Sequence, residues 1–187
     1  MARARGCGGS GFTLVEILMV LALLGLVMAF ALPKINFEAY RLSGAVRGAE
    51  GLLARAQRLA VTEQSNVNVL FDVANNAIKL HEDANNNNVI DPGERVRSYP
   101  LGDGVVYGIG AAPTRLYAPA PISFVHTMSG TPEIIFRRDG SASENGGFYI
   151  TAQYSTSASD ARSVEVIQST GRVEWYQYTG AQWVKKF

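Results

Sequence analysis

One acidic side chain, Glu16, lies at the start of an otherwise apolar stretch. Residues 17–32 include no charged and no strongly polar side chain. A helix over residues 12–32 would be about 30 Å long at ~1.5 Å per residue, which is enough to cross a bilayer. A carboxylate at the mouth of such a helix costs roughly a few kcal/mol unless a cation pairs with it. The position of Glu16 therefore predicts either a specific ion pair or a place among lipid headgroups.

The segment before this stretch is basic and open. Residues 1–11 contain Arg3 and Arg5, no acidic residue, and a Gly/Ser run that ends at Gly11. Cationic residues before an apolar helix favour a cytoplasmic N-terminus. A protease needs an extended peptide in its active site, and a glycine just before a helix can adopt that conformation. The segment is therefore a candidate leader peptide.

Residues 11–33 resemble the class III signal of type IV pilins and type II secretion pseudopilins. The resemblance rests on Gly11, Phe12, Glu16, the unbroken apolar run and Pro33. It implies cleavage between Gly11 and Phe12 by a prepilin peptidase, and N-methylation of Phe12. It also implies that Glu16 is the assembly glutamate, which neutralises the N-terminal amine of a neighbouring subunit, and that the helix kinks at Pro33.

The same resemblance implies a single-pass protein of the bacterial inner membrane. Its N-terminus would be cytoplasmic and its head periplasmic, until the subunit moves into a periplasmic filament. The implied partners are the prepilin peptidase and N-methyltransferase, the membrane, and other pseudopilins or pilins in a helical filament. A secreted substrate is a further candidate partner.

An ordinary secretory signal peptide is the alternative reading of this segment. The sequence Ala-Phe-Ala at 29–31 has the small-x-small form of a signal peptidase site. The length of the apolar run, the charge of Glu16 within it and the helical pattern that follows argue against it. The two readings differ in the mature N-terminus, which is methylated Phe12 in one and Leu32 in the other.

The 187-residue chain has a formal net charge of +1 and a single cysteine. A near-neutral balance argues against a partner held by charge over the whole surface. Cys7 lies in the leader segment, so the mature chain is expected to have no thiol and no disulfide. The predicted organisation is a leader over 1–11, a transmembrane and assembly helix over 12–33, an amphipathic helix over 34–64 and a β-rich periplasmic head over 65–187.

The amphipathic helix is predicted from an apolar stripe at helical spacing. Steps of four and three residues lead through Leu42, Val46, Ala49, Leu53, Ala56 and Ala60. Gly44, Gly48 and Gly51 each weaken such a helix by up to about 1 kcal/mol relative to alanine, so the helix needs tertiary support. We expect the stripe to pack on the head, and the small residues to let the backbone approach a sheet closely.

From Asn66 onward the pattern changes to alternation with period two, with turn signals between short runs. The predicted strands cover residues 67–71, 77–80, 96–99, 105–109, 122–125, 133–137, 148–154, 162–167 and 172–176. Short strands without helices between them imply antiparallel sheet packed on itself and on the amphipathic helix. The predicted fold class is α+β, with a long N-terminal helix, transmembrane and then amphipathic, packed on an antiparallel β-sandwich head.

Several segments after residue 33 resemble the H-type minor pseudopilins, a group that also contains the pilus protein FimT. The similar segments are an Ala- and Arg-rich helix running into a strand over 53–71, an acidic Asn-rich turn before a strand over 83–97, and closing strands over 134–141 and 170–173. The resemblance implies a pilin-like fold. It also implies a minor subunit that initiates or caps a short filament.

The Asn-rich turn carries oxygen side chains at the spacing of a calcium-binding loop. Its positions 1, 3, 5, 7, 9 and 12 are Asp83, Asn85, Asn87, Val89, Asp91 and Glu94. The main-chain carbonyl of Val89 would be the position-7 ligand, and Asn88 replaces the glycine expected at position 6. A solvated turn is the alternative, because Asn and Asp cap turns. Ca²⁺ is the only cofactor that the sequence suggests.

The expected function is that of a non-enzymatic minor pseudopilin in a type II secretion pseudopilus. His81 and His126 are isolated in the sequence and have no paired nucleophile or carboxylate motif, so no catalytic site is predicted. The alternative function is that of a minor pilin in a type IV pilus whose head binds DNA in natural transformation.

Phosphate contacts in that alternative need clustered cations. The candidates are Arg137, Arg138, Arg172, Lys185 and Lys186. Trp183 and Phe187 lie beside the last two and could stack on bases. An ordinary solubilising surface is the other reading of these cations.

Overall fold

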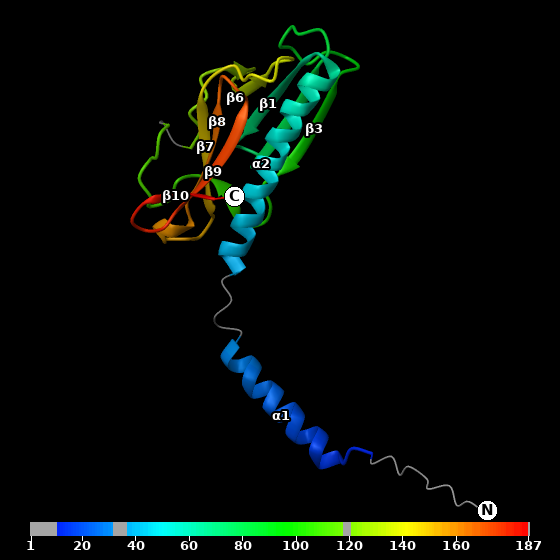
Figure 1. Ribbon diagram of the computed structural model, residues 1–187, viewed down its shortest axis with the longest axis vertical. Helices are drawn as coiled ribbons and strands as arrows, with labels where there is room; N and C mark the ends of the chain where they lie inside the picture. Colours follow the sequence, from blue (N-terminus) through cyan, green and yellow to red (C-terminus); the bar gives the residue numbers. More distant parts are fainter. Residues whose placement is uncertain (1–10, 32–36, 118–120, 187) are drawn as a thin grey trace, which may run out of the picture. The chain divides into compact units, whose positions relative to one another are not determined.

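The computed structural model describes residues 11–31, 37–117 and 121–186 (Figure 1). The chain divides into two compact units, of which the first ends at Phe37 and the second runs from Glu38 to Phe187. The leader residues 1–10, with Cys7, and the kink predicted at Pro33 lie outside the described residues.

The helix α1 is formed by the apolar run. It covers Leu14–Ala31, which is 18 residues. The last two residues of the predicted 12–33 segment lie outside the described residues. The helix begins at Leu14 because Thr13 caps it, with the backbone N–H of Glu16 donating to the Thr13 hydroxyl oxygen at 3.2 Å. In the described parts of the chain no helix is both long and apolar enough to cross a membrane, so the transmembrane part of the predicted fold is not supported.

The helix α2 (Phe37–Glu63) forms where the apolar stripe predicted it. All six residues of the stripe are buried, and they pack in one core with both sheets. The glycines do not lie against a sheet, because a Cβ built on Gly44, Gly48 or Gly51 would meet no atom within 4 Å. The expectation of a close sheet approach at these glycines was therefore wrong, and the stripe residues, alanines included, make the packing contact.

The first sheet has the strand order β3-β2-β1-β6-β5, and its pairs are antiparallel. Its strands are β1 (Asn66–Asp72), β2 (Ala77–Asp83), β3 (Arg95–Pro100), β5 (Thr127–Met128) and β6 (Thr131–Phe136). Val69 pairs with Leu80 on one side and with Ile134 on the other, and all three side chains are buried. Opposed residues share a face of a sheet, so this row faces the core shared with α2.

The second sheet has the order β10-β9-β8-β7-β4. Its strands are β4 (Val105–Tyr107), β7 (Gly146–Ala152), β8 (Arg162–Ile167), β9 (Arg172–Tyr178) and β10 (Trp183–Lys186), with a short 3-10 helix η2 (Ala158–Asp160) before β8. The strands β5 and β10 were not predicted. The strand predicted over 122–125 is wrong, since this segment forms only an isolated bridge between Ile122 and Phe148.

Aromatic side chains join the two sheets in one core. Phe71 from β1 lies 4.9 Å from Phe148 of β7 and 6.5 Å from Tyr107 of β4, measured between ring centroids. Phe124 stacks on Phe71 at 5.0 Å. Two antiparallel sheets with a packed amphipathic helix confirm the predicted α+β class of the head.

Candidate functional site

The start of α1 contains the residues predicted for processing and assembly. Gly11 and Phe12 precede the helix, and Glu16 lies in its first turn. The backbone N–H of Ile17 donates to the Thr13 carbonyl oxygen at 3.2 Å, which closes that turn. Glu16 forms no ion pair with any described residue. Within one chain, the hydrogen bonds that Thr13 accepts therefore fix the first turn, in which Glu16 lies.

The side chains of α1 form an apolar surface without a polar face. Its large apolar residues are exposed, from 47% for Ile17 to 76% for Leu14, and Phe12 before the helix is 78% exposed. A helix that is apolar all round belongs against other apolar groups rather than in water. The segment thus carries surface that this unit does not bury by itself.

The predicted calcium loop connects β2 to β3 and folds around its first residue. Asp83 is almost fully buried at the end of β2. One of its carboxylate oxygens accepts the backbone N–H of Asn87 at 3.1 Å, and the other accepts that of Asn88 at 2.9 Å. Asn88 adopts a φ of 59°, the left-handed conformation that the glycine at this position would supply.

The later acidic residues of the loop close it from the other side. Asp91 Oδ2 accepts the side-chain amides of Asn85 at 2.8 Å and Asn87 at 2.6 Å. Glu94 accepts the backbone N–H of Ala84 at 3.0 Å and that of Asp91 at 2.9 Å. These hydrogen bonds, the Asp91 N–H above all, hold the pKa of Glu94 below its usual range.

The structure therefore brings the predicted ligands into one loop and engages them with N–H donors of that loop. Val89 contributes its backbone N–H to Asn87 Oδ1 at 2.8 Å, and its side chain is exposed. Among the described residues, no group of three His, Cys, Asp or Glu side chains is arranged to hold a metal ion. Calcium binding by this loop stays a prediction.

Below the loop lies a buried polar network that the sequence did not reveal. Asn68 on β1 donates to Asn88 Oδ1 at 2.8 Å, and Asn88 donates to Glu133 Oε1 on β6 at 2.9 Å. Asn68 and Glu133 are fully buried, and Asn68 Oδ1 and Glu133 Oε2 find no hydrogen-bond partner among the described residues. Burial, opposed by the Asn88 hydrogen bond, raises the pKa of Glu133. Alternation along the strands gave no sign of this network, because it joins residues of β1, the loop and β6 that are far apart in the sequence.

Both histidines have a carboxylate partner, so the expectation that they are isolated was wrong. His81 Nε2 lies 2.7 Å from Glu94 Oε2, in a pair that is almost fully buried. His126 Nδ1 lies 2.8 Å from Glu144 Oε1 at a more exposed position. The partners are 13 residues apart in the first pair and 18 in the second, so spacing along the chain did not signal either contact.

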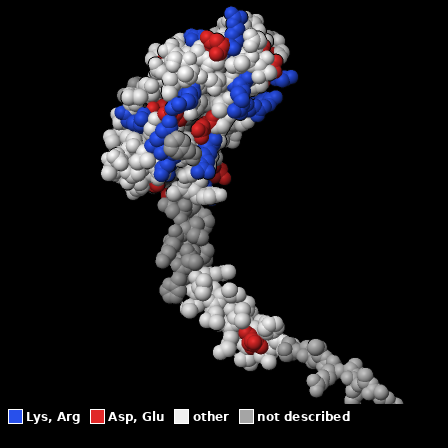
Figure 2. Space-filling model, in the orientation of Figure 1, with Lys and Arg blue, Asp and Glu red and all other residues white. Residues whose placement is uncertain are grey.

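The five cations considered for nucleic-acid binding do not form one bare cluster. Arg172 and Lys185 share the carboxylate of Glu174, with Lys185 Nζ at 2.7 Å. Arg137 donates to the Ala142 carbonyl oxygen at 3.1 Å. Arg138 is exposed, and Lys186 lies half-buried on β10. In Figure 2, Lys and Arg side chains are interspersed with Asp and Glu over the visible face.

The aromatic candidates for base stacking are not free either. Trp183 donates its indole N–H to the Pro113 carbonyl oxygen at 3.1 Å. Its ring lies 5.3 Å from that of Tyr178 and 5.9 Å from that of Tyr149. The other candidate, Phe187, lies outside the described residues. The indole of Trp183 therefore serves the packing of β10 rather than an open stacking platform.

Comparison with known proteins supports the fold. No family model matches the sequence, and no curated protein matches it either. Among solved structures, the chain is similar to the minor pseudopilin EpsH from the type 2 secretion system of Vibrio cholerae, with a TM-score of 0.50 and 12% sequence identity. The match covers 76% of this chain and 99% of the EpsH chain. The chain therefore has a pseudopilin-like fold.

Proposed function

We propose that this chain is a minor pseudopilin of the H type, a non-enzymatic structural subunit of a type II secretion pseudopilus. The observation that carries the proposal is a pseudopilin-like fold in the same chain as α1, an exposed apolar helix with Glu16 in its first turn. Such a helix is stable when other apolar surface covers it. Helices of neighbouring subunits in a filament would supply that surface.

Glu16 would set the register between subunits. Cleavage after Gly11 would leave a cationic amine on Phe12, close to the apolar surface of α1. Placing an unpaired carboxylate in apolar surroundings costs on the order of several kcal/mol of free energy, and a cation from a neighbouring subunit offsets that cost. Only subunits staggered so that the amine of one reaches Glu16 of the next would then pack stably. The lack of an ion pair to Glu16 among the described residues leaves this carboxylate available for such a neighbour.

The proposal includes a route to the filament. Before assembly, the subunit would reside in the inner membrane with a periplasmic head, where prepilin peptidase would cleave the leader and methylate Phe12. The support for these steps is the resemblance of residues 11–33 to the class III signal. The head would then contact other pseudopilins or a secreted substrate.

The test is assembly in cells that also produce the prepilin peptidase and the other pseudopilins. We expect mass spectrometry to find methylated Phe12 at the mature N-terminus, and Glu16→Ala to reduce the subunit in sheared filaments by at least about tenfold. Glu38→Ala is the matched control, because Glu38 is an exposed acid in the first turn of α2. Normal incorporation of Glu16→Ala, or a mature chain that keeps residues 1–11, would refute the proposal.

The type IV pilus alternative with a DNA-binding head receives less support. Two of its five candidate cations share Glu174, and Trp183 is packed between tyrosines. The alternative would be supported if the full chain bound DNA, if this binding weakened as salt rose, and if Arg138→Glu abolished it.

A further inference from the structure

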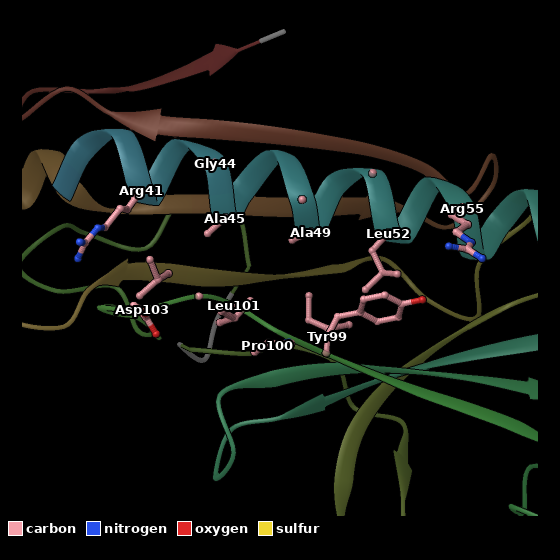
Figure 3. A pocket seen from close by; sticks show the side chains of 15 residues that line it. Arg41, Gly44, Ala45, Ala49, Leu52, Arg55, Tyr99, Pro100, Leu101 and Asp103 are labelled. Atoms are coloured by element: carbon pink, nitrogen blue, oxygen red, sulfur yellow. The ribbon is translucent and has the colours of Figure 1, made fainter. Parts of the chain in front are cut away.

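A groove lies between α2 and the edge of the first sheet, with a volume of about 730 Å³. One wall is the face of α2 between Arg41 and Arg55, and the other is formed by Tyr99 at the end of β3 and the turn through Asp103. Figure 3 shows the two arginines at opposite ends of the helical wall, with Leu52 and Tyr99 between the walls. The groove lies wholly within the unit that begins at Glu38.

The helical wall of the groove is lined by glycines, and no contact within this chain requires them. Gly44, Gly48 and Gly51 line the groove, and a Cβ on any of them would point into open space. Alanine would stabilise the helix at each position by up to about 1 kcal/mol. Glycines here therefore weaken the helix without relieving any contact inside this chain, and what they provide is room for another backbone.

The opposite wall belongs to an edge strand. β3 pairs only with β2 in the described sheet, so its other side presents unpaired N–H and C=O groups. The register places Tyr99 opposite Ile78 and Arg97 opposite Leu80. Because opposed residues share a face, Tyr99 and Arg97 project to the same side of the sheet as α2. The main chain of β3 thus offers hydrogen bonds at its free edge, and the end of the strand, at Tyr99 and Pro100, lines the groove.

Positive charge surrounds the groove. Arg41 and Arg55 on α2 and Arg97 on β3 form no ion pair with any described residue. Asp103 is the single acid among the residues that line the groove. This charge favours an acidic occupant.

We infer that the groove binds an extended acidic segment of a partner protein, which adds to β3 as a new edge strand. The helix from Arg41 to Arg55 is about 21 Å long at ~1.5 Å per residue. An extended segment covers that length in about six residues at ~3.4 Å each. The segment has carboxylates near both ends, for the arginines, and small apolar residues between them. This surface is independent of the role proposed for α1.

Two other occupants fit less well. A second copy of the chain pairing through β3 would bring together two strands that each carry Arg95 and Arg97, and like charges at a sheet edge disfavour pairing. A helical partner would cover the glycines but leave the main-chain groups of β3 without hydrogen bonds. Only an extended strand uses both walls and the charge together.

The experiment measures peptide binding to the full chain, purified in detergent, by fluorescence anisotropy. The probe is a labelled peptide of seven residues with aspartate at both ends and alternating valine and alanine between them. One control peptide has lysine at both ends, and another has the acidic sequence with N-methylated central residues, which cannot form strand hydrogen bonds. We expect the acidic peptide to bind at least about tenfold more tightly than either control, and less tightly as salt rises.

Variants of the protein locate the binding. Gly48→Leu fills the groove while leaving the fold intact, since its side chain enters open space, and Arg55→Glu reverses one end charge. Each should weaken acidic peptide binding at least about fivefold. Arg47→Glu is the matched control, because Arg47 is exposed on α2 and does not line the groove. Equal binding of the N-methylated peptide, unchanged affinity in Gly48→Leu, or no binding of the acidic peptide at low salt would each overturn the inference.

Discussion

The helices α1 and α2 differ in the burial of their apolar side chains. On α1, Leu23 is 62% exposed, whereas Leu53 on α2 is fully buried in the head. Polar residues explain the difference, since arginines and glutamates interrupt the apolar residues of α2 and confine them to one stripe, while the run from Ile17 through α1 has none. Changes in α2 should therefore alter the stability of the subunit, and changes in α1 should alter its association.

The largest expected effect tests this division directly. Leu53→Ala should lower the free energy of unfolding of the head by about 2–5 kcal/mol, because it leaves a cavity among buried residues. Leu23→Ala should change it by less than about 0.5 kcal/mol. Urea unfolding followed by tryptophan fluorescence measures both, since Trp175 is buried in the head. Similar losses in the two variants would show that α1 also stabilises the head.

Two carboxyl groups of the network around the Asn-rich loop should respond to pH with opposite signs. The lowered pKa of Glu94 means that its stabilising effect is present above the ordinary value of 4.5 and is lost as pH falls through the folded-state pKa. Glu94→Gln should therefore lower the melting temperature at pH 7, and the difference should shrink in acid.

Glu133 should behave in the reverse way. Because the pKa of Glu133 is raised, its protonated form stabilises the fold below pH 4.5, the ordinary pKa of the group. This stabilisation is lost as pH rises through the folded-state pKa. Glu133→Gln should raise the melting temperature at pH 7, and this gain should vanish below pH 4.5. Thermal melts of both variants between pH 4 and 8 give the comparison, and shifts of equal sign at pH 7 would contradict it.

Calcium should have a smaller effect, confined to the head. If the loop binds the ion, a concentration of ten times Kd adds about 1.4 kcal/mol, or roughly 3–6 °C in melting temperature. We expect this shift with CaCl₂ and its loss in Asp91→Asn, while the exposed Asp103→Asn, outside the loop, retains it. If the melting temperature does not change when calcium is added, the loop is a turn closed by its own hydrogen bonds and the calcium prediction is wrong.

The smallest expected effect comes from glycine-to-alanine changes, compared between the two helices. Gly25 on α1 and Gly48 on α2 both have open space where a Cβ would lie. Gly48→Ala should raise the stability of the head by up to about 1 kcal/mol through helix propensity. Gly25→Ala should leave the melting temperature of the head unchanged. A loss of stability in Gly48→Ala would mean that the subunit itself needs this glycine.

Much of the fold was predictable because its signals are periodic. The stripe from Leu42 to Ala60 identified α2, and alternation located most of the strands. The short strand β10 escaped because its four residues, Trp183–Lys186, are all half-buried and show no alternation. It forms through pairing with β9, and such pairing depends on a neighbour rather than on the segment alone.

The candidate sites divide in the same way. The chemistry at the start of α1 is local, because Thr13 and Glu16 lie within one helical turn of each other, and their spacing is visible in the printed chain. The loop ligands from Asp83 to Glu94 are also local. The contact between His81 and Glu94, the burial of Glu133 and the sharing of Glu174 by Arg172 and Lys185 are not.

Periodicity, caps and short motifs are thus sufficient for the helices, for most strands and for the position of Glu16, because each depends on neighbours within a few residues. The groove beside α2, the buried network and the sharing of Glu174 by Arg172 and Lys185 emerge only when the chain folds and its strands pair. Their reason is physical: charge, burial and hydrogen bonding depend on distance in space, which folding sets between residues far apart along the chain.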